Sequence, residues 1–153
     1  MSEIVSLDLR IRPMTVAAID KVRALEAVLS TAPQSVIETH HVLHGGQYTR
    51  TVMLPAGTVI TGALIKTPTT LTIAGDCTAY IGDDVITLSG YNVMAASAGR
   101  KQAFVAHTDT YMTMTFATDA KTIEEAEDAF TDEGHMLLSR SEFGRNAILI
   151  TGE

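Results

Sequence analysis

Three regions of the chain differ in how apolar and polar residues alternate. In the first, residues 1–34, apolar positions alternate with polar ones up to Ile11 and then recur every three or four residues. Alternation is typical of an extended strand, whereas the longer spacing is typical of one helical face. Pro13 separates the two patterns, and Thr15 is the expected N-cap. We therefore predict an N-terminal arm followed by an amphipathic helix, with an apolar face made of Val16, Ile19, Val22, Leu25, Val28 and Leu29.

The second region, residues 35–119, is rich in threonine, valine and isoleucine, which favour strands. Turn signals containing glycine or proline recur at short intervals, so we expect about eight or nine short strands. Such a density predicts a β-sandwich or barrel. Alternation is clearest from Tyr111 to Phe116, where Met112 and Met114 share the expected core face with Phe116.

The third region, residues 120–153, begins with a short helical pattern. Thr122 and Glu125 fit a capping box, and several acidic residues lie in the early turns, where they suit the helix dipole. The tail that follows has two apolar patches. We expect it to form an added strand, or an arm that packs on the barrel or on a partner.

Composition limits the classes of partner. The chain has 153 residues, 46% of them hydrophobic, and a formal net charge of -7. A basic surface for nucleic acid is therefore not expected, and no apolar run approaches the ~20 residues of a membrane-spanning helix. The charged N-terminal residues do not resemble a signal peptide. The single cysteine, Cys77, lies in an apolar run and is interpreted as a small buried hydrophobe.

The segment from Pro55 to Asp76, PAGTVITGALIKTPTTLTIAGD, resembles the first sequence motif of the cupin superfamily. Gly57 and Gly75 stand at the opening and closing glycines of that motif. The resemblance implies a mainly β fold, to which the patterns described above add an N-terminal helix and a short C-terminal helix. Its centre is a single RmlC-like jelly-roll barrel, a double-stranded β-helix, over residues 35–119. Cupins commonly associate through their sheets, so a homo-oligomer is implied as well.

A closer resemblance, over about Thr39 to Thr118, is to cupin-like proteins of tailed bacteriophages. It implies other phage proteins as partners and a location in the virion or the host cytoplasm. The resemblance is carried by the order and spacing of several short motifs: His40-His41, Gly46, Tyr48, Arg50; Pro55, Gly57, Thr58, Thr61, Gly62; Ser97 to Lys101; and His107 to Thr110.

The residues that would hold a cupin metal ion are absent from these motifs. The two histidine positions fall near Ala63 and Ile65, and the glutamate position falls near Thr69 or Thr70. Where the second cupin motif commonly has a histidine, this chain has Gln102, which is a weak transition-metal ligand. We predict that the usual metal site is lost and that no cofactor is bound.

The remaining histidines invite a different metal hypothesis. His40, His41 and His44 lie close together, but adjacent residues of a strand point to opposite faces. His41 could join His107 if their strands are neighbours, which would supply two imidazoles and no obvious third ligand. We therefore favour structural or surface roles for the histidines.

Five polar residues are candidates for holding a small molecule: Tyr48, Arg50, Gln102, His107 and Asp109. An arginine with a tyrosine and a glutamine can hold an anionic or amide-bearing molecule by directional hydrogen bonds. The simpler alternative, which we favour, is that Arg50 pairs with an acidic neighbour such as Asp109 and only ties strands together.

Three functions are considered, and the sequence favours the first of them. The first is a non-catalytic phage protein in which the barrel serves virion assembly or an accessory role. The second is a protein that binds or sequesters a metabolite or nucleotide. The third is an enzyme with unusual residues, for example His107 acting as a base beside Asp109. We rank the enzyme last, because the chain shows no nucleophile elbow and no phosphate loop.

Overall fold

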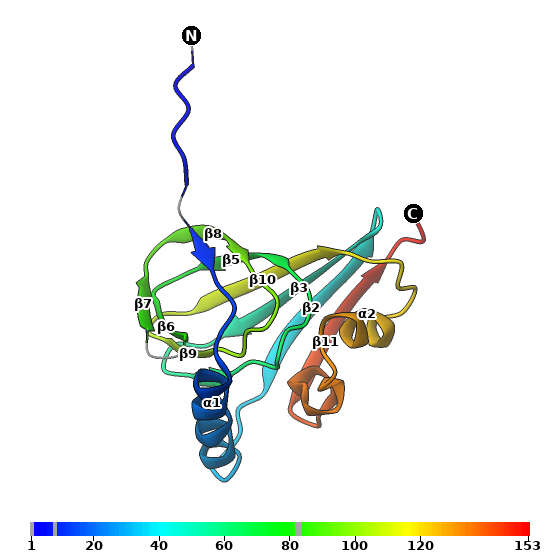
Figure 1. Cartoon of the computed structure of the whole chain (residues 1–153). Coiled ribbons are helices and arrows are strands. Elements are labelled where there is room, and N and C mark those ends of the chain that lie inside the picture. Colours follow the sequence, from blue (N-terminus) through cyan, green and yellow to red (C-terminus); the bar gives the residue numbers. More distant parts are fainter. Residues whose placement is uncertain (1, 8, 82–83) are drawn as a thin grey trace.

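Two β-sheets face each other and form the body of the protein (Figure 1). The computed structural model describes residues 2–7, 9–81 and 84–153. The larger sheet contains, in spatial order, Arg10–Ile11 (β1), Tyr91–Ala96 (β8), Thr69–Ala74 (β5), Thr110–Ala117 (β10), Gln47–Leu54 (β3), Ile37–His44 (β2) and Gly144–Ile150 (β11). The smaller sheet contains Val59–Thr61 (β4), Ala103–Ala106 (β9), Cys77–Ile81 (β6) and Asp84–Leu88 (β7).

The connectivity of β3 to β10 is that of a jelly roll. The order β8-β5-β10-β3 in the larger sheet faces the order β7-β6-β9-β4 in the smaller one, and the chain crosses repeatedly between them. Eight strands in two Greek keys define this architecture. The predicted fold is therefore confirmed, as a mainly β jelly-roll barrel with one N-terminal helix and one short C-terminal helix.

The core lies between the two sheets. Met114 and Phe116 are buried, as their alternation predicted, and Tyr111 on the opposite face is exposed. Cys77 is fully buried, in agreement with its interpretation as a small hydrophobe. The rings of Tyr48, Phe116 and Phe130 pack against one another at one end of this core.

Two glycines of the cupin-like motif have backbone conformations that other residues rarely adopt. Gly57 has φ +84° and Gly75 has φ +135°. At Gly75 a Cβ atom would also lie 2.7 Å from Oγ1 of Thr110 and 2.8 Å from the carbonyl oxygen of Asp109. The motif's glycines are therefore required by turn geometry and by the close approach of a neighbouring chain segment.

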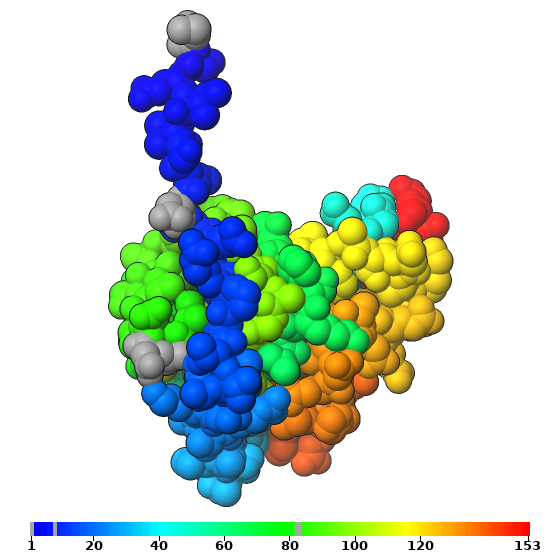
Figure 2. All heavy atoms as spheres, in the orientation of Figure 1, coloured from blue at the N-terminus to red at the C-terminus, as the bar shows by residue number. Residues whose placement is uncertain are grey.

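The N-terminal region contains a free arm and a helix that is only partly packed. Helix α1, Val16–Leu29, begins after Thr15, whose hydroxyl accepts a hydrogen bond from the Ala18 N–H. Ala18 and Val22 are buried, but Val16 and Val28 are 76% and 66% exposed, so only part of the predicted apolar face packs. Residues 2–7 extend away from the body (Figures 1 and 2).

The C-terminal region completes the larger sheet. Helix α2, Ile123–Phe130, is capped by Thr122, which accepts from the Glu125 N–H, while the Glu125 carboxylate accepts from the N–H of Lys121. Two short 3₁₀ helices follow, Gly134–Met136 (η1) and Leu138–Arg140 (η2). Strand β11 then pairs in parallel with β2, which is the added strand considered from the sequence. Neither helix in the described part of the chain is long and apolar enough to span a membrane.

Candidate functional site

A cavity of about 170 Å³ lies inside the barrel. Its wall is mostly apolar and includes Ile65, Leu71, Phe104, Met112 and Met114. The charged residues of the wall are Glu26, Arg50, Arg100, Lys101 and Glu133, and Gln102 is among its polar residues.

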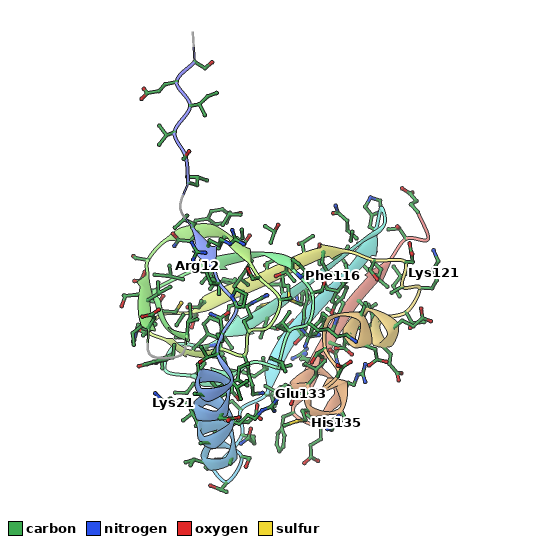
Figure 3. The ribbon with its side chains drawn as sticks, viewed as in Figure 1. Arg12, Lys21, Phe116, Lys121, Glu133 and His135 are labelled. Carbon is green, nitrogen blue, oxygen red and sulfur yellow. The ribbon has the colours of Figure 1, made fainter. Side chains whose placement is uncertain are left out.

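The cavity reaches the surface between α1 and the segment after α2. Glu26 of α1 lines that end together with Glu133 and Met136, and Met136 is 49% exposed. Figure 2 shows α1, in blue, beside the C-terminal segment, in orange, and Figure 3 labels Glu133 on that segment. Nη1 of Arg23 donates to Oε2 of Glu133 at 2.8 Å, so an ion pair links the two sides of the opening.

Arg100 is a buried cation without a carboxylate partner in the described residues. It forms an isolated bridge with Ile65, and its side chain is 2% exposed. Nη1 donates to the carbonyl oxygen of Ser97 at 2.6 Å, and Nη2 donates to Oγ1 of Thr69 at 2.8 Å. Burial lowers the pKa of Arg100 to about 10, because a charged group loses its hydration there. Even so, Arg100 is charged at neutral pH.

Gln102 has an unsatisfied amide group. It follows Arg100 by two residues, lines the same cavity, and is 4% exposed. Its Nε2 is buried and has no hydrogen-bond partner among the described residues. A buried donor without an acceptor costs about 1–3 kcal/mol. This amide nitrogen is therefore available to donate a hydrogen bond to a ligand.

The other cations of the cavity wall are matched by carboxylates. Nζ of Lys101 lies 2.9 Å from Oε2 of Glu26. Nη1 of Arg50 lies 2.7 Å from Oε2 of Glu127. The expected pairing of Arg50 with an acidic neighbour is confirmed, but the neighbour is Glu127 of α2 and not Asp109, because the chain brings α2 against the end of the barrel.

Arg50 belongs to a buried network with Tyr48 and His41. Arg50 donates to the Tyr48 hydroxyl at 3.2 Å, and Nδ1 of His41 lies 2.7 Å from the same hydroxyl. Nε2 of His41 lies 2.7 Å from Oδ1 of Asn146. Burial raises the pKa of Tyr48 and lowers that of His41, so both side chains are neutral near pH 7. This network joins the barrel to β11 behind the cavity.

His107 and Asp109 lie away from the cavity. Nε2 of His107 lies 2.7 Å from Oγ1 of Thr78, and Asp109 accepts from the N–H of Ala56 at 2.9 Å. Both residues are exposed. Asp109 instead lines a separate surface depression.

The strands near His41 and His107 are not neighbours, so the two imidazoles do not form the metal pair considered as an alternative. His41 belongs to β2 of the larger sheet, whereas His107 follows β9 of the smaller one. Of the five candidates, Arg50 and Gln102 line the cavity, Tyr48 supports Arg50 from behind, and the other two lie elsewhere.

Sequence reasoning missed Arg100 and Thr69 as parts of the site. From the sequence, Arg100 was placed only within the phage-like motif from Ser97 to Lys101. The available signal was its spacing from Gln102, since residues two apart in an extended segment share a face.

The residues in the cavity do not fit a cupin metal ion. Ala63, Ile65 and Gln102, which stand at ligand positions of the cupin motifs, do line the cavity, but none offers an imidazole or carboxylate. The two carboxylates of the wall, Glu26 and Glu133, are engaged by Lys101 and Arg23. Across residues 2–7, 9–81 and 84–153, no group of three or more His, Cys, Asp or Glu side chains could hold a metal ion.

Comparison with known proteins adds no function. No family model matches the chain, and no curated protein matches it. A cupin superfamily protein from Desulfitobacterium hafniense is 16% identical, with a TM-score of 0.46 over 61% of this chain and 87% of that one. An RmlC-like cupin protein from Desulfovibrio desulfuricans is 18% identical, with a TM-score of 0.41 over 57% of this chain and 90% of that one.

Ectoine synthase from P. lautus is 15% identical, with a TM-score of 0.43 over 61% of this chain and 74% of the enzyme. Identities and TM-scores this low carry no statement about ligand or activity. The class of the protein is given by its own strand order, which is that of a cupin-like jelly-roll barrel.

Proposed function

We propose that this protein is a non-catalytic cupin-like barrel that binds a small molecule between its two sheets. The observation that carries the proposal is Nε2 of Gln102, which is buried on the wall of a 170 Å³ cavity without a partner among the described residues. An engineered cavity of about 150 Å³ is large enough to take benzene. The cavity therefore has room for a ligand that would satisfy this amide.

The charged groups of the cavity support binding more than catalysis. A general acid or base must be free to exchange a proton near the reacting atoms. Glu26 and Glu133 are held in ion pairs, and an arginine such as Arg100 keeps its proton at neutral pH. His107 and Asp109, the acid-base pair considered from the sequence, lie outside the cavity.

A cavity-filling variant tests this function. Thermal unfolding is measured with a library of small metabolites and nucleotides for the wild type and for Ala63→Leu, which places a larger side chain on the cavity wall. We expect at least one compound to raise the Tm of the wild type and not of the variant. Ala117→Leu, at an exposed position, is the matched control and should keep the response. A library without effect on the wild type would overturn the proposal.

The N-terminal arm favours a second, compatible function in assembly. Ile4, Val5 and Leu7 are 93%, 73% and 81% exposed on a segment that stands clear of the body (Figure 2). Contiguous exposed apolar side chains mark surfaces that pack on another chain. Together with the resemblance to cupin-like proteins of tailed phages, this supports a homo-oligomeric virion or accessory protein that binds other phage proteins, in the virion or the host cytoplasm.

Deletion of residues 2–7 tests the assembly function. We expect the deletion to leave the unfolding temperature nearly unchanged, because these side chains pack on nothing in their own barrel. If the arm serves assembly, the deletion should lower the oligomeric mass in sedimentation or remove the protein from purified virions. A wild-type protein that is monomeric and absent from virions would exclude this second function.

A further inference from the structure

We propose that the cavity binds a small monocarboxylate, with its carboxylate held by Arg100 and Gln102 and its apolar body held between the sheets. This inference rests on the proposed binding function and names the chemical class of its ligand.

The charge balance of the cavity favours an anion. Its wall carries three cations, Arg50, Arg100 and Lys101, and two carboxylates, Glu26 and Glu133. Arg50 and Lys101 have carboxylate partners at 2.7 and 2.9 Å. Arg100 is left with a carbonyl oxygen, a hydroxyl and, at 4.0 Å, the sulfur of Met114. One positive charge inside the barrel thus has no counterion in the described chain.

Burying an uncompensated charge is costly, and pairing it removes much of the cost. A guanidinium offers five N–H donors in a planar fork that matches the two oxygens of a carboxylate. Because Arg100 is 2% exposed, solvent does little to stabilise its charge. A bound anion would supply the compensation that the fold itself does not.

Gln102 supplies the second point of recognition. Arg100 and Gln102 both line the cavity from the segment that leads into β9. The free Nε2 of Gln102 needs an acceptor oxygen, and a carboxylate bound to Arg100 would bring one into the same cavity. A single negative charge matches the single unpaired cation, so a monocarboxylate fits this site better than a phosphate dianion.

The rest of the wall sets the size and polarity of the ligand's body. Ile65, Leu71, Phe104, Met112 and Met114 offer apolar contact and no ionisable group. Since a cavity of about 150 Å³ holds benzene, one of 170 Å³ suits a ligand of roughly six to eight non-hydrogen atoms. A branched or cyclic carboxylic acid of four to six carbons fits these limits.

The test compares 3-methylbutanoate with 3-methylbutanamide, a neutral compound of the same shape. Calorimetric titration and thermal unfolding are carried out at pH 7.5 on the wild type. We expect the acid to bind and to raise the Tm, and the amide to bind at least tenfold more weakly. 2-Methylpropanoate and cyclopentanecarboxylate, each with its own amide, extend the comparison across the size range.

Gln102→Glu provides the decisive variant. It places a carboxylate on the wall of the cavity that Arg100 also lines, so an internal anion takes the ligand's role and binding of the acid should be lost. Gln47→Glu makes the same change of charge at an exposed position of β3 and should bind as the wild type does. Gln102→Leu removes only the amide and should lower the affinity for the acid by at least fivefold. This second variant keeps the test decisive if Gln102→Glu fails to fold.

The outcomes distinguish failure of the carboxylate inference from failure of the proposed small-molecule binding. If neutral compounds raise the Tm of the wild type but lose their effect in Ala63→Leu, while the acids bind no better than their amides, the carboxylate inference is overturned and cavity binding stands. If acid binding survives in Gln102→Glu, the carboxylate is held elsewhere and the inference is also overturned. If no compound of either kind binds, both proposals fall.

Discussion

Nη1 of Arg50 in β3 donates a hydrogen bond to Oε2 of Glu127 in α2 at 2.7 Å, and the two side chains are only 9% and 3% exposed. The same carboxylate accepts from Nε of Arg140 at 2.9 Å and from the Ser139 hydroxyl. Arg50 also donates to Ser139 through Nη2. The end of the barrel, α2 and η2 are therefore joined through one buried carboxylate.

Replacing Glu127 by glutamine should destabilise the protein strongly. The change leaves the Arg50 guanidinium buried without its counterion, and breaking a buried ion pair in this way costs about 3–5 kcal/mol. Urea unfolding monitored by circular dichroism measures the loss. Glu124→Gln, on an exposed position of the same helix, should change the free energy of unfolding by less than about 0.5 kcal/mol. Similar losses for the two variants would contradict the role given to Glu127.

Stability should fall in two steps as the pH is lowered. Burial lowers the pKa of His41 below its ordinary value of 6.5, although the hydrogen bond to Asn146 opposes the shift. The unfolded chain therefore binds a proton at His41 before the folded chain does, and stability is lost as the pH falls through 6.5.

The second step comes from two carboxylates. Burial alone would raise the pKa of Glu127, but hydrogen bonds from Ser139, Arg140 and Arg50 outweigh it and hold the pKa below 4.5. Glu133 behaves in the same way through Arg23 and the Leu64 N–H. Their stabilisation is present above pH 4.5 and is lost below it. Urea midpoints from pH 8 to 3 check both steps, and His41→Gln should remove the first one only.

The features predicted well from the sequence are those with a local cause. Nine strands, β2 to β10, lie between residues 35 and 119 of the described chain, because β-branched runs and turn residues define each strand within a few positions. Thr15 and Thr122 were recognised as helix caps for the same reason, since a cap acts on the next three residues.

The contacts that define the site have no local cause. Glu127 lies 77 residues after Arg50, and nothing in the spacing of either residue indicates the pair. Likewise, Arg100 and Lys101 look like one basic patch in the sequence. In the fold, Arg100 contacts Thr69 and Ser97, while Lys101 contacts Glu26 and Gly62. The path of α2 and the docking of α1 decide these partners.

Gly75→Ala should destabilise the barrel by about 1–3 kcal/mol or more. The new Cβ would meet the Thr110 hydroxyl and the Asp109 carbonyl oxygen, and φ of +135° is unfavourable for alanine. Gly90→Ala is the matched control, because Gly90 also has a positive φ, +76°, but its Cβ would meet nothing within 4 Å. Thermal unfolding should therefore show a larger loss at Gly75. Equal losses would mean that the close approach of Thr110 contributes nothing.

Lys101→Met should loosen α1 from the barrel. The Lys101 side chain is 1% exposed, and its Nζ donates to Oε2 of Glu26 in α1 and to the carbonyl oxygen of Gly62, both at 2.9 Å. Without it Glu26 loses its cation and Glu133 loses a neighbouring positive charge at 3.8 Å. Because the pair is largely buried, we expect a loss of about 2–4 kcal/mol and faster hydrogen exchange in α1 than in α2.

Lys66→Met is the control for this prediction, since Lys66 forms an ion pair of similar length with Asp132, at 2.7 Å, on the surface. Exposed pairs contribute about 0–1 kcal/mol, so this variant should unfold nearly as the wild type does and exchange its α1 amides at the same rate. If both lysine variants behave alike, burial of Lys101 gives its ion pair no special importance, and α1 must be held by its other contacts, such as buried Ala18 and Val22 and the Arg23–Glu133 ion pair. If only Lys101→Met speeds hydrogen exchange in α1, then Lys101, which lines the cavity wall, also attaches the helix that borders the cavity's opening.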